Sequence, residues 1–152
     1  MHDIRPDHAN QSGLDILRSM ITGTLPGPTM ARTMNIRLTE AVRGAVVFHG
    51  TPGDDVLNPR GAVHGGWYGA LLDSAMGCAV QSVLEAGQVY TTLEYKVNLT
   101  RAIPPGTEVE ARAQVQHGGR STAVAIGEIR GISDGRLYAT GSTTCIVMSA
   151  KP

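Results

Sequence analysis

The segment "NPRGAVHGGWYGALLDSAMG", residues 58–77, holds the groups best suited to chemistry. Gly65 and Gly66 stand where a loop passes into an apolar helix. We therefore expect their unpaired N–H groups to point outward, with the positive end of the helix dipole behind them and room for a ligand. Such donors suit a carbonyl oxygen that becomes negative during acyl transfer. A glycine pair alone would favour a plainer alternative, a helix start that needs small residues for close packing.

Asp73 is the one carboxylate within residues 58–77. Its neighbours Leu71, Leu72, Ala75 and Met76 are apolar, and carboxylates are rarely buried without a partner or a task. Burial would raise the pKa of Asp73 towards the range useful to a general base. An inert carboxylate, hydrogen-bonded at a polar subunit interface, has equal weight on the evidence of this residue alone.

The spacing of Gly65 and Asp73 carries information of its own. Eight positions of α-helix span about 12 Å, whereas a base and an oxyanion donor must each stand about 3 Å from one reacting centre. One helix is therefore poorly placed to supply both. If both groups are catalytic, we expect at least a dimer with two antiparallel helices, in which Gly65 of one chain faces Asp73 of its mate.

Two polar residues precede the helix. His64 could be a general base, but a histidine immediately before a helix more often orients the loop by hydrogen bonding to the backbone, and we favour that role. Asn58 could polarise a substrate carbonyl or a water. Its alternative role is to satisfy the turn at Pro59.

Composition narrows the class of protein. A chain of 152 residues fits one domain, and thirteen basic residues balance thirteen acidic ones without a basic run. Nucleic acid is therefore not an expected partner. Cys78 and Cys145 lie in apolar segments without metal-ligand spacing, which indicates buried thiols and a cytoplasmic protein. The polar N-terminal residues lack the apolar core of a secretory signal, and Asp73 within the long apolar segment 67–84 indicates a core helix rather than a membrane span.

Periodicity predicts the order of the elements. A 3.6-residue period indicates helices over residues 12–22 and 65–86, the second ended by Gly87. Alternation indicates a hairpin of strands 33–38 and 45–50, and further antiparallel strands at 93–100, 108–116, 121–131 and 136–148. A helix that is apolar nearly all round cannot lie on a sheet with one side in water, so the sheet must curl around it or a partner must cover it.

The motifs together resemble one family. "N-x-x-G-x-x-H-G-G" from residue 58, "LLDSAMG", "TTLEYKVNLTR", "GR" at 119–120 and "DGRLYATGSTT" at 134–144 are similar to the hotdog-fold acyl-CoA thioesterases of the phenylacetate-pathway (PaaI-like) type. The likeness covers about residues 25–148. It implies an α+β hotdog fold, in which a curved antiparallel sheet wraps the long central helix, and dimers that usually pair into tetramers. We expect residues 1–24 to form an N-terminal lead-in with a short helix, and 25–150 to form the hotdog thioesterase domain.

The resemblance also implies roles for residues around the helix start. The Gly65 N–H would bind the thioester carbonyl, and Asp73 of the opposite subunit would act as base or nucleophile. Asn58 and His64 match loop positions that support the site. Gly66 would let the substrate approach the backbone.

Other positions match the family on the strands and beside the glycines. Thr92, or Thr91 if the register slips, matches a hydroxyl that helps to place the attacking water in some members. Arg101 and Arg120 match basic positions near the CoA phosphates, although solvated surface arginines are an equal alternative. Trp67 and its neighbour Tyr68 are candidates to wall the acyl pocket, with core packing as the competing role for at least one of them.

These assignments predict hydrolysis of an acyl-CoA thioester to free acid and CoA by a cytoplasmic homodimer or homotetramer. No metal or redox cofactor is expected, because CoA is part of the substrate, and no nucleic acid or membrane partner is expected. Two alternatives stay open. One is a hotdog enoyl-CoA hydratase or dehydratase with His64 as base, and the other is a non-catalytic acyl-CoA binding module in which Asp73 is structural.

Overall fold

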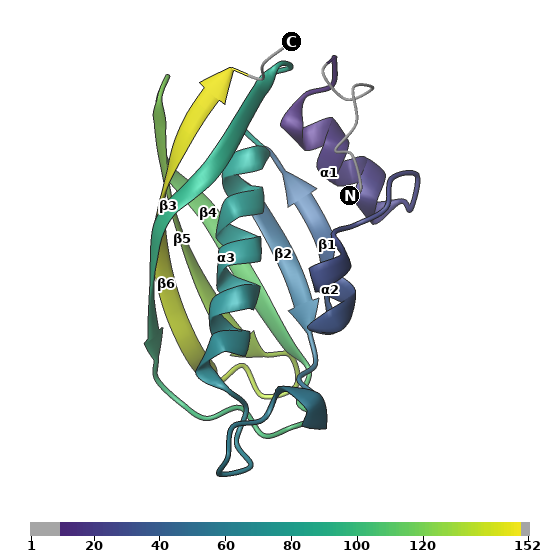
Figure 1. Cartoon of the computed structure of the whole chain (residues 1–152), viewed down its shortest axis with the longest axis vertical. Coiled ribbons are helices and arrows are strands. Elements are labelled where there is room, and N and C mark those ends of the chain that lie inside the picture. Colours follow the sequence, from purple (N-terminus) through teal and green to yellow (C-terminus); the bar gives the residue numbers. More distant parts are fainter. Residues whose placement is uncertain (1–9, 150–152) are drawn as a thin grey trace.

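A curved antiparallel sheet and one enclosed helix organise the computed structural model, which describes residues 10–149 (Figure 1). The strands lie in the order β1-β2-β4-β5-β6-β3, and every neighbouring pair is antiparallel. The helices are α1 (Gly13–Ile21), α2 (Thr29–Thr33), the short 3-10 helix η2 (Asp54–Val56) and α3 (Gly65–Gln81). The strands are β1 (Ile36–Val42), β2 (Ala45–Gly50), β3 (Gln88–Leu99), β4 (Val109–Gly118), β5 (Thr122–Gly131) and β6 (Leu137–Ser149).

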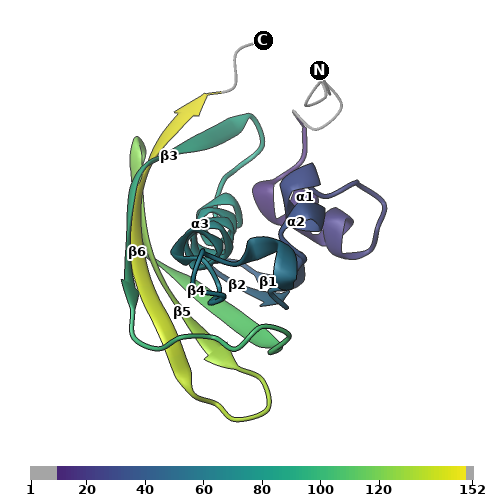
Figure 2. The same ribbon diagram turned by 60° about the horizontal axis from the view of Figure 1, so that its bottom comes forward.

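The sheet curls around α3, as the apolar helix requires. Figure 2 shows α3 inside the curve, with β3 on one side and α1 and α2 on the other. The buried residues of α3 lie on several sides of the helix, and a curved sheet can cover several sides where a flat sheet would cover one. The predicted α+β hotdog fold is thereby confirmed.

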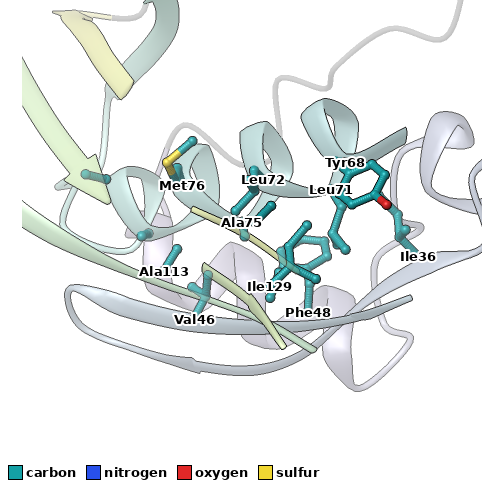
Figure 3. Packing of buried hydrophobic residues seen from close by; sticks show 14 of the residues in the cluster. Ile36, Val46, Phe48, Tyr68, Leu71, Leu72, Ala75, Met76, Ala113 and Ile129 are labelled. Carbon is teal, nitrogen blue, oxygen red and sulfur yellow. The ribbon is translucent and has the colours of Figure 1, made fainter. Parts of the chain in front are cut away.

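Small residues on the strands let α3 lie close to the sheet. Leu71, Leu72 and Met76 are fully buried and pack towards Val46, Phe48, Ala113 and Ile129 of the sheet (Figure 3). A Cβ on Gly127 would stand only 3.2 Å from Leu72 Cδ2 and from Met76 Cγ. Close packing of this kind is sensitive to the addition of even one methyl group.

Helix α3 ends earlier than the periodicity predicts. Its last residue is Gln81 rather than residue 86, and Gly87, at φ +78°, shapes the turn before β3 instead of capping the helix. The buried Ser82 is the reason for the early end. Its hydroxyl donates to Ala79 O at 2.7 Å and accepts from Gly44 N at 2.8 Å, which ties the helix end to the β1–β2 hairpin.

The N-terminal segments pack against this core. Ser12 caps α1, Leu17 is buried, and Gly13 N donates to Leu84 O at 2.9 Å. Helix α2 is absent from the sequence-based prediction, which starts a strand at residue 33. That strand, β1, begins at Ile36, after Asn35 adopts a left-handed φ of 50°.

Strand β3 forms one edge of the sheet, and β6 is the one strand of residues 10–149 that pairs with it. The register between β3 and β6 shifts at Leu93, which forms a bulge between the paired residues Thr92 and Glu94. Four apolar side chains of this edge are between 41% and 58% exposed, namely Val89, Leu93, Tyr95 and Leu99. A long edge strand has unpaired backbone N–H and C=O groups, and with exposed apolar side chains beside them it can pair with a strand of another chain.

Candidate active site at the start of helix α3

Asn58 organises the loop that leads into α3. Its Oδ1 accepts hydrogen bonds from Arg60 N at 2.9 Å and Ala62 N at 3.2 Å. Its backbone N–H donates to Ala62 O at 2.8 Å. In this geometry the amide oxygen of Asn58 is used to hold the turn, as one of its two expected roles requires.

His64 caps the helix with its side chain. Nδ1 accepts a hydrogen bond from Gly66 N at 2.9 Å, so the neutral ring carries its proton on Nε2. The expectation that both glycine N–H groups are unpaired is therefore wrong for Gly66. Among the described residues, none accepts a hydrogen bond from the Gly65 N–H. The cap thus leaves the Gly65 N–H without a described partner at the positive end of the helix dipole. Gly65 itself is not part of the lining of the nearby cavity, which includes its neighbours His64 and Gly66.

Asp73 lies two turns further along α3 and is half-buried. The hydroxyl of Thr92 on β3 donates to Asp73 Oδ1 at 3.1 Å. Thr91, the neighbouring candidate, is exposed, and successive strand residues face opposite sides of a sheet. Within one chain, Thr92 is therefore the hydroxyl that holds the helix carboxylate.

One cavity of about 410 Å³ joins the helix start to Asp73. It brings together His64, Gly66, Trp67 and Asp73 in a single chain. The sequence-based reasoning missed several of its other walls, because they come from α2, the η2 loop and the inner face of β3. The full lining is Met30, Met34, Asp55, Val56, Leu57, His64, Gly66, Trp67, Ala70, Asp73 and Tyr95.

Trp67 both lines this cavity and packs in the core. It is 2% exposed, and its Nε1–H donates to Met34 O at 2.9 Å, which fastens the end of α2 to α3. Tyr68 meets Trp67 edge-on, with ring centroids 6.1 Å apart. The Tyr68 hydroxyl accepts from Ile103 N at 2.7 Å and donates to Arg101 O at 3.3 Å. Tyr68 therefore belongs to the core rather than to the cavity wall.

Arg101 and Arg120 lie at opposite ends of the sheet in one chain, and both are exposed. Arg101 follows Leu99, whose Cδ1 would stand 3.2 Å from a Cβ on Gly65, so it belongs to the end where α3 begins. Arg120 lies in the turn before Thr122. Thr122 and Thr91 both pair with Ile146, and Thr91 lies near the start of β3, whereas Leu99 is its last residue, so Arg120 belongs to the opposite end of the sheet. A single protomer does not bring the two arginines together.

Two further ionisable groups lie around the second half of α3. Burial, followed by the charge of Asp73, raises the pKa of Cys78 to about 12. Burial likewise raises the pKa of Tyr90 far above its usual range. Both groups stay protonated at neutral pH, so neither offers a thiolate or a phenolate to the site.

Comparison with known proteins identifies the family of the chain. The family model described as Thioesterase superfamily matches residues 60–138, just over half of the chain. No curated protein sequence matches the chain. The chain belongs to the thioesterase superfamily. The start of α3 and Asp73 lie inside the matched region, whereas the cavity walls from α2 and the η2 loop lie before it.

Solved structures place the chain near the phenylacetate-degradation members. A phenylacetic acid degradation-related protein from Ralstonia eutropha is 32% identical, with a TM-score of 0.77 over 86% of this chain and 98% of that one. The PaaI protein of Escherichia coli has the same fold, with 21% identity and a TM-score of 0.79 over 92% and 99%. A hypothetical thioesterase of Streptococcus pneumoniae, solved with coenzyme A, is 25% identical, with a TM-score of 0.69 over 78% and 89%.

No helix within residues 10–149 is long and apolar enough to cross a bilayer.

Proposed function

We propose that the protein hydrolyses acyl-CoA thioesters to a free acid and CoA. Membership of the thioesterase superfamily supports thioester chemistry, and the relative from Streptococcus pneumoniae was solved with coenzyme A. The proposal rests chiefly on the different states of two adjacent N–H groups at the start of α3. The His64 ring occupies the N–H of Gly66 and leaves that of Gly65 for a substrate oxygen.

The active unit of this proposal is a homodimer, and two dimers form a homotetramer. Gly65 and Asp73 of one helix are about 12 Å apart along the axis, too far for one thioester carbon. Pairing of two β3 edges would cover the exposed apolar side chains of that strand and set two α3 helices antiparallel. Gly65 of one protomer would then face Asp73 of the other.

In the proposed reaction, the Asp73 carboxylate takes a proton from a water that attacks the thioester carbon, or attacks that carbon itself. The carbonyl oxygen becomes negative and accepts a hydrogen bond from the Gly65 N–H. The C–S bond then breaks and CoA leaves as a thiolate. After attack by water, the thiolate recovers the proton held by Asp73; after direct attack, it is protonated by solvent, and water hydrolyses the anhydride on Asp73 to the free acid. Every group in this scheme is a main-chain or side-chain atom, so no resident cofactor is needed.

The remaining predicted residues support these two groups. Asn58 and His64 hold the loop, and Thr92 holds Asp73. An antiparallel dimer would also bring Arg101 of one protomer and Arg120 of the other to the same end of the assembly, where both can meet CoA phosphates. Cys78 and Cys145 are free thiols, which suits the reducing cytoplasm in which we expect the enzyme to work.

A hydratase or dehydratase that uses His64 as base is the second candidate. Its base would need a free lone pair, yet Nδ1 accepts from Gly66 N and Nε2 of the neutral ring carries the proton. The third candidate is a binding module without turnover. The structure offers no feature that favours either one over hydrolysis.

A panel of acyl-CoA substrates with a thiol reagent to detect released CoA tests the proposal. We expect turnover by the wild type and a loss of at least about 100-fold in kcat for Asp73→Asn, because general-base catalysis typically contributes that much. Equal rates for the two proteins would contradict the role of Asp73. An enoyl-CoA hydrated without CoA release would favour the second candidate, and a raised Tm without turnover would favour the third.

A further inference from the structure

The charged groups around the site cavity are unevenly distributed. Its lining contains two carboxylates, Asp55 and Asp73, and neither lysine nor arginine occurs among the described residues that form it. The other walls are mostly apolar side chains from α2, the η2 loop and α3. A ligand that enters this cavity therefore meets negative charge and apolar surface, with His64 as the one basic side chain of the lining.

Asp55 has no role in the proposed hydrolysis. It lies on η2, beside the cavity residues Val56 and Leu57, and it is exposed. The ion pairs found within residues 10–149 do not include it, so no lysine or arginine there is in direct contact with its carboxylate. Its neighbour Asp54 is also exposed but is not part of the lining, and it provides a matched control.

We propose that the cavity selects uncharged acyl groups, and that Asp55 excludes acyl groups that end in a carboxylate. The inference rests on the proposed function and names the substrate class of that site. A terminal carboxylate would lose its hydration against the apolar walls without gaining a cation. It would also stand near a like charge, and repulsion between partly exposed charges a few ångströms apart changes binding by about five- to tenfold.

Hexanoyl-CoA and adipyl-CoA form a suitable pair of probes, because their acyl chains have the same length and differ by one terminal carboxylate. The quantity to measure is the ratio of kcat/KM for hexanoyl-CoA to that for adipyl-CoA at neutral pH. We expect a ratio well above one for the wild type, about fivefold lower for Asp55→Asn, and at least about tenfold lower for Asp55→Lys. Asp54→Lys adds the same charge outside the cavity and should keep the wild-type ratio.

Two results would overturn the inference. One is an equal drop in Asp55→Lys and Asp54→Lys, which would mean that only net charge matters, and the other is an unchanged ratio in every Asp55 variant. The ratio of the dissociation constants of the hexyl and 5-carboxypentyl thioethers of CoA measures the same discrimination at the binding step, without turnover. Failure to hydrolyse any acyl-CoA would therefore count against the proposed function, while the thioether ratios still decide the role of Asp55.

Discussion

The Thr92 hydroxyl donates a hydrogen bond of 3.1 Å to Asp73 Oδ1, and so joins the edge strand β3 to the central helix. A hydroxyl in this position fixes the orientation of the carboxylate. We predict that Thr92→Ala lowers kcat by at least about tenfold, since a hydrogen bond to a charged group contributes about 1.5–3 kcal/mol.

Thr92→Ser retains the donor and is the matched control for this change. It should recover most of the wild-type kcat, while KM for the acyl-CoA stays similar in all three proteins. A serine variant as impaired as the alanine variant would show that the methyl group, and hence packing, is what matters at Thr92.

Replacement of His64 separates its two possible roles. Asparagine is a good N-cap residue and can accept from Gly66 N in place of the ring, whereas alanine cannot. We predict that His64→Ala loses about 1 kcal/mol of unfolding free energy together with activity, and that His64→Asn keeps most of both. Urea denaturation and CoA release measure the two effects. A stable but inactive His64→Asn would indicate instead that the imidazole takes part in the chemistry.

Gly77 is predicted to be intolerant of a side chain. A Cβ there would stand 2.5 Å from the Tyr90 hydroxyl and 3.2 Å from two ring carbons. We expect Gly77→Ala to cost about 1–3 kcal/mol of unfolding free energy, as overpacking of a core does. Addition of Tyr90→Phe removes the nearest atom and should recover part of the loss. Additive effects in the double variant would argue that Tyr90 and Gly77 are not in conflict.

The raised pKa of Cys78 predicts that its thiol is alkylated slowly in the folded protein. With a pKa of about 12, the thiolate is scarce at pH 8, and alkylation should be at least about 100-fold slower in the folded protein than in urea. A Cys145→Ala background assigns the mass change to Cys78. Because the charge of Asp73 contributes to the upward shift, Asp73→Asn should lower the pKa and speed alkylation. Folded and unfolded chains that react equally fast would refute the assignment.

Much of the fold could be predicted because its signals are long and repeated. The alternation of the later strands and the apolar helix around Leu71 and Leu72 left two options, a sheet curled over the helix or a partner that covers it, and the resemblance to the hotdog family favoured the first. Helix α2 was missed since five residues give fewer than two turns, and its support is a distant one, the bond from Trp67 Nε1 to Met34 O. The end of α3 was misplaced for a similar reason, because Ser82 is bound to the hairpin at Gly44.

The candidate site could be predicted in part from its motif. The segment from Asn58 to Asp73 drew attention to a helix start and a carboxylate, and His64, Gly66 and Asp73 line one cavity, whereas Asn58 and Gly65 do not. Whether the Gly66 N–H is free depends on the rotamer of His64, which spacing does not specify. The contribution of Asp55 was missed because it depends on how η2 lies against α2 and α3 in three dimensions.

The oxyanion donor can be removed with little disturbance of the backbone. Gly65 is the first residue of α3, where proline is well tolerated, and His64 already has the extended φ −64° and ψ 138° that suit a residue before proline. Gly65→Pro therefore deletes the N–H. Gly65→Ala places a similar Cβ beside Leu99 but keeps the N–H, and it serves as the steric control.

Heterodimers test the central claim most directly. Asp73→Asn and Gly65→Pro chains, co-expressed with different affinity tags and purified through both tags, would each be inactive as homodimers. If Gly65 of one chain works with Asp73 of the other, each mixed dimer regains one intact site, and we predict about half of the wild-type kcat per dimer. Mixed dimers that form but stay as inactive as either parent would contradict a site shared between protomers.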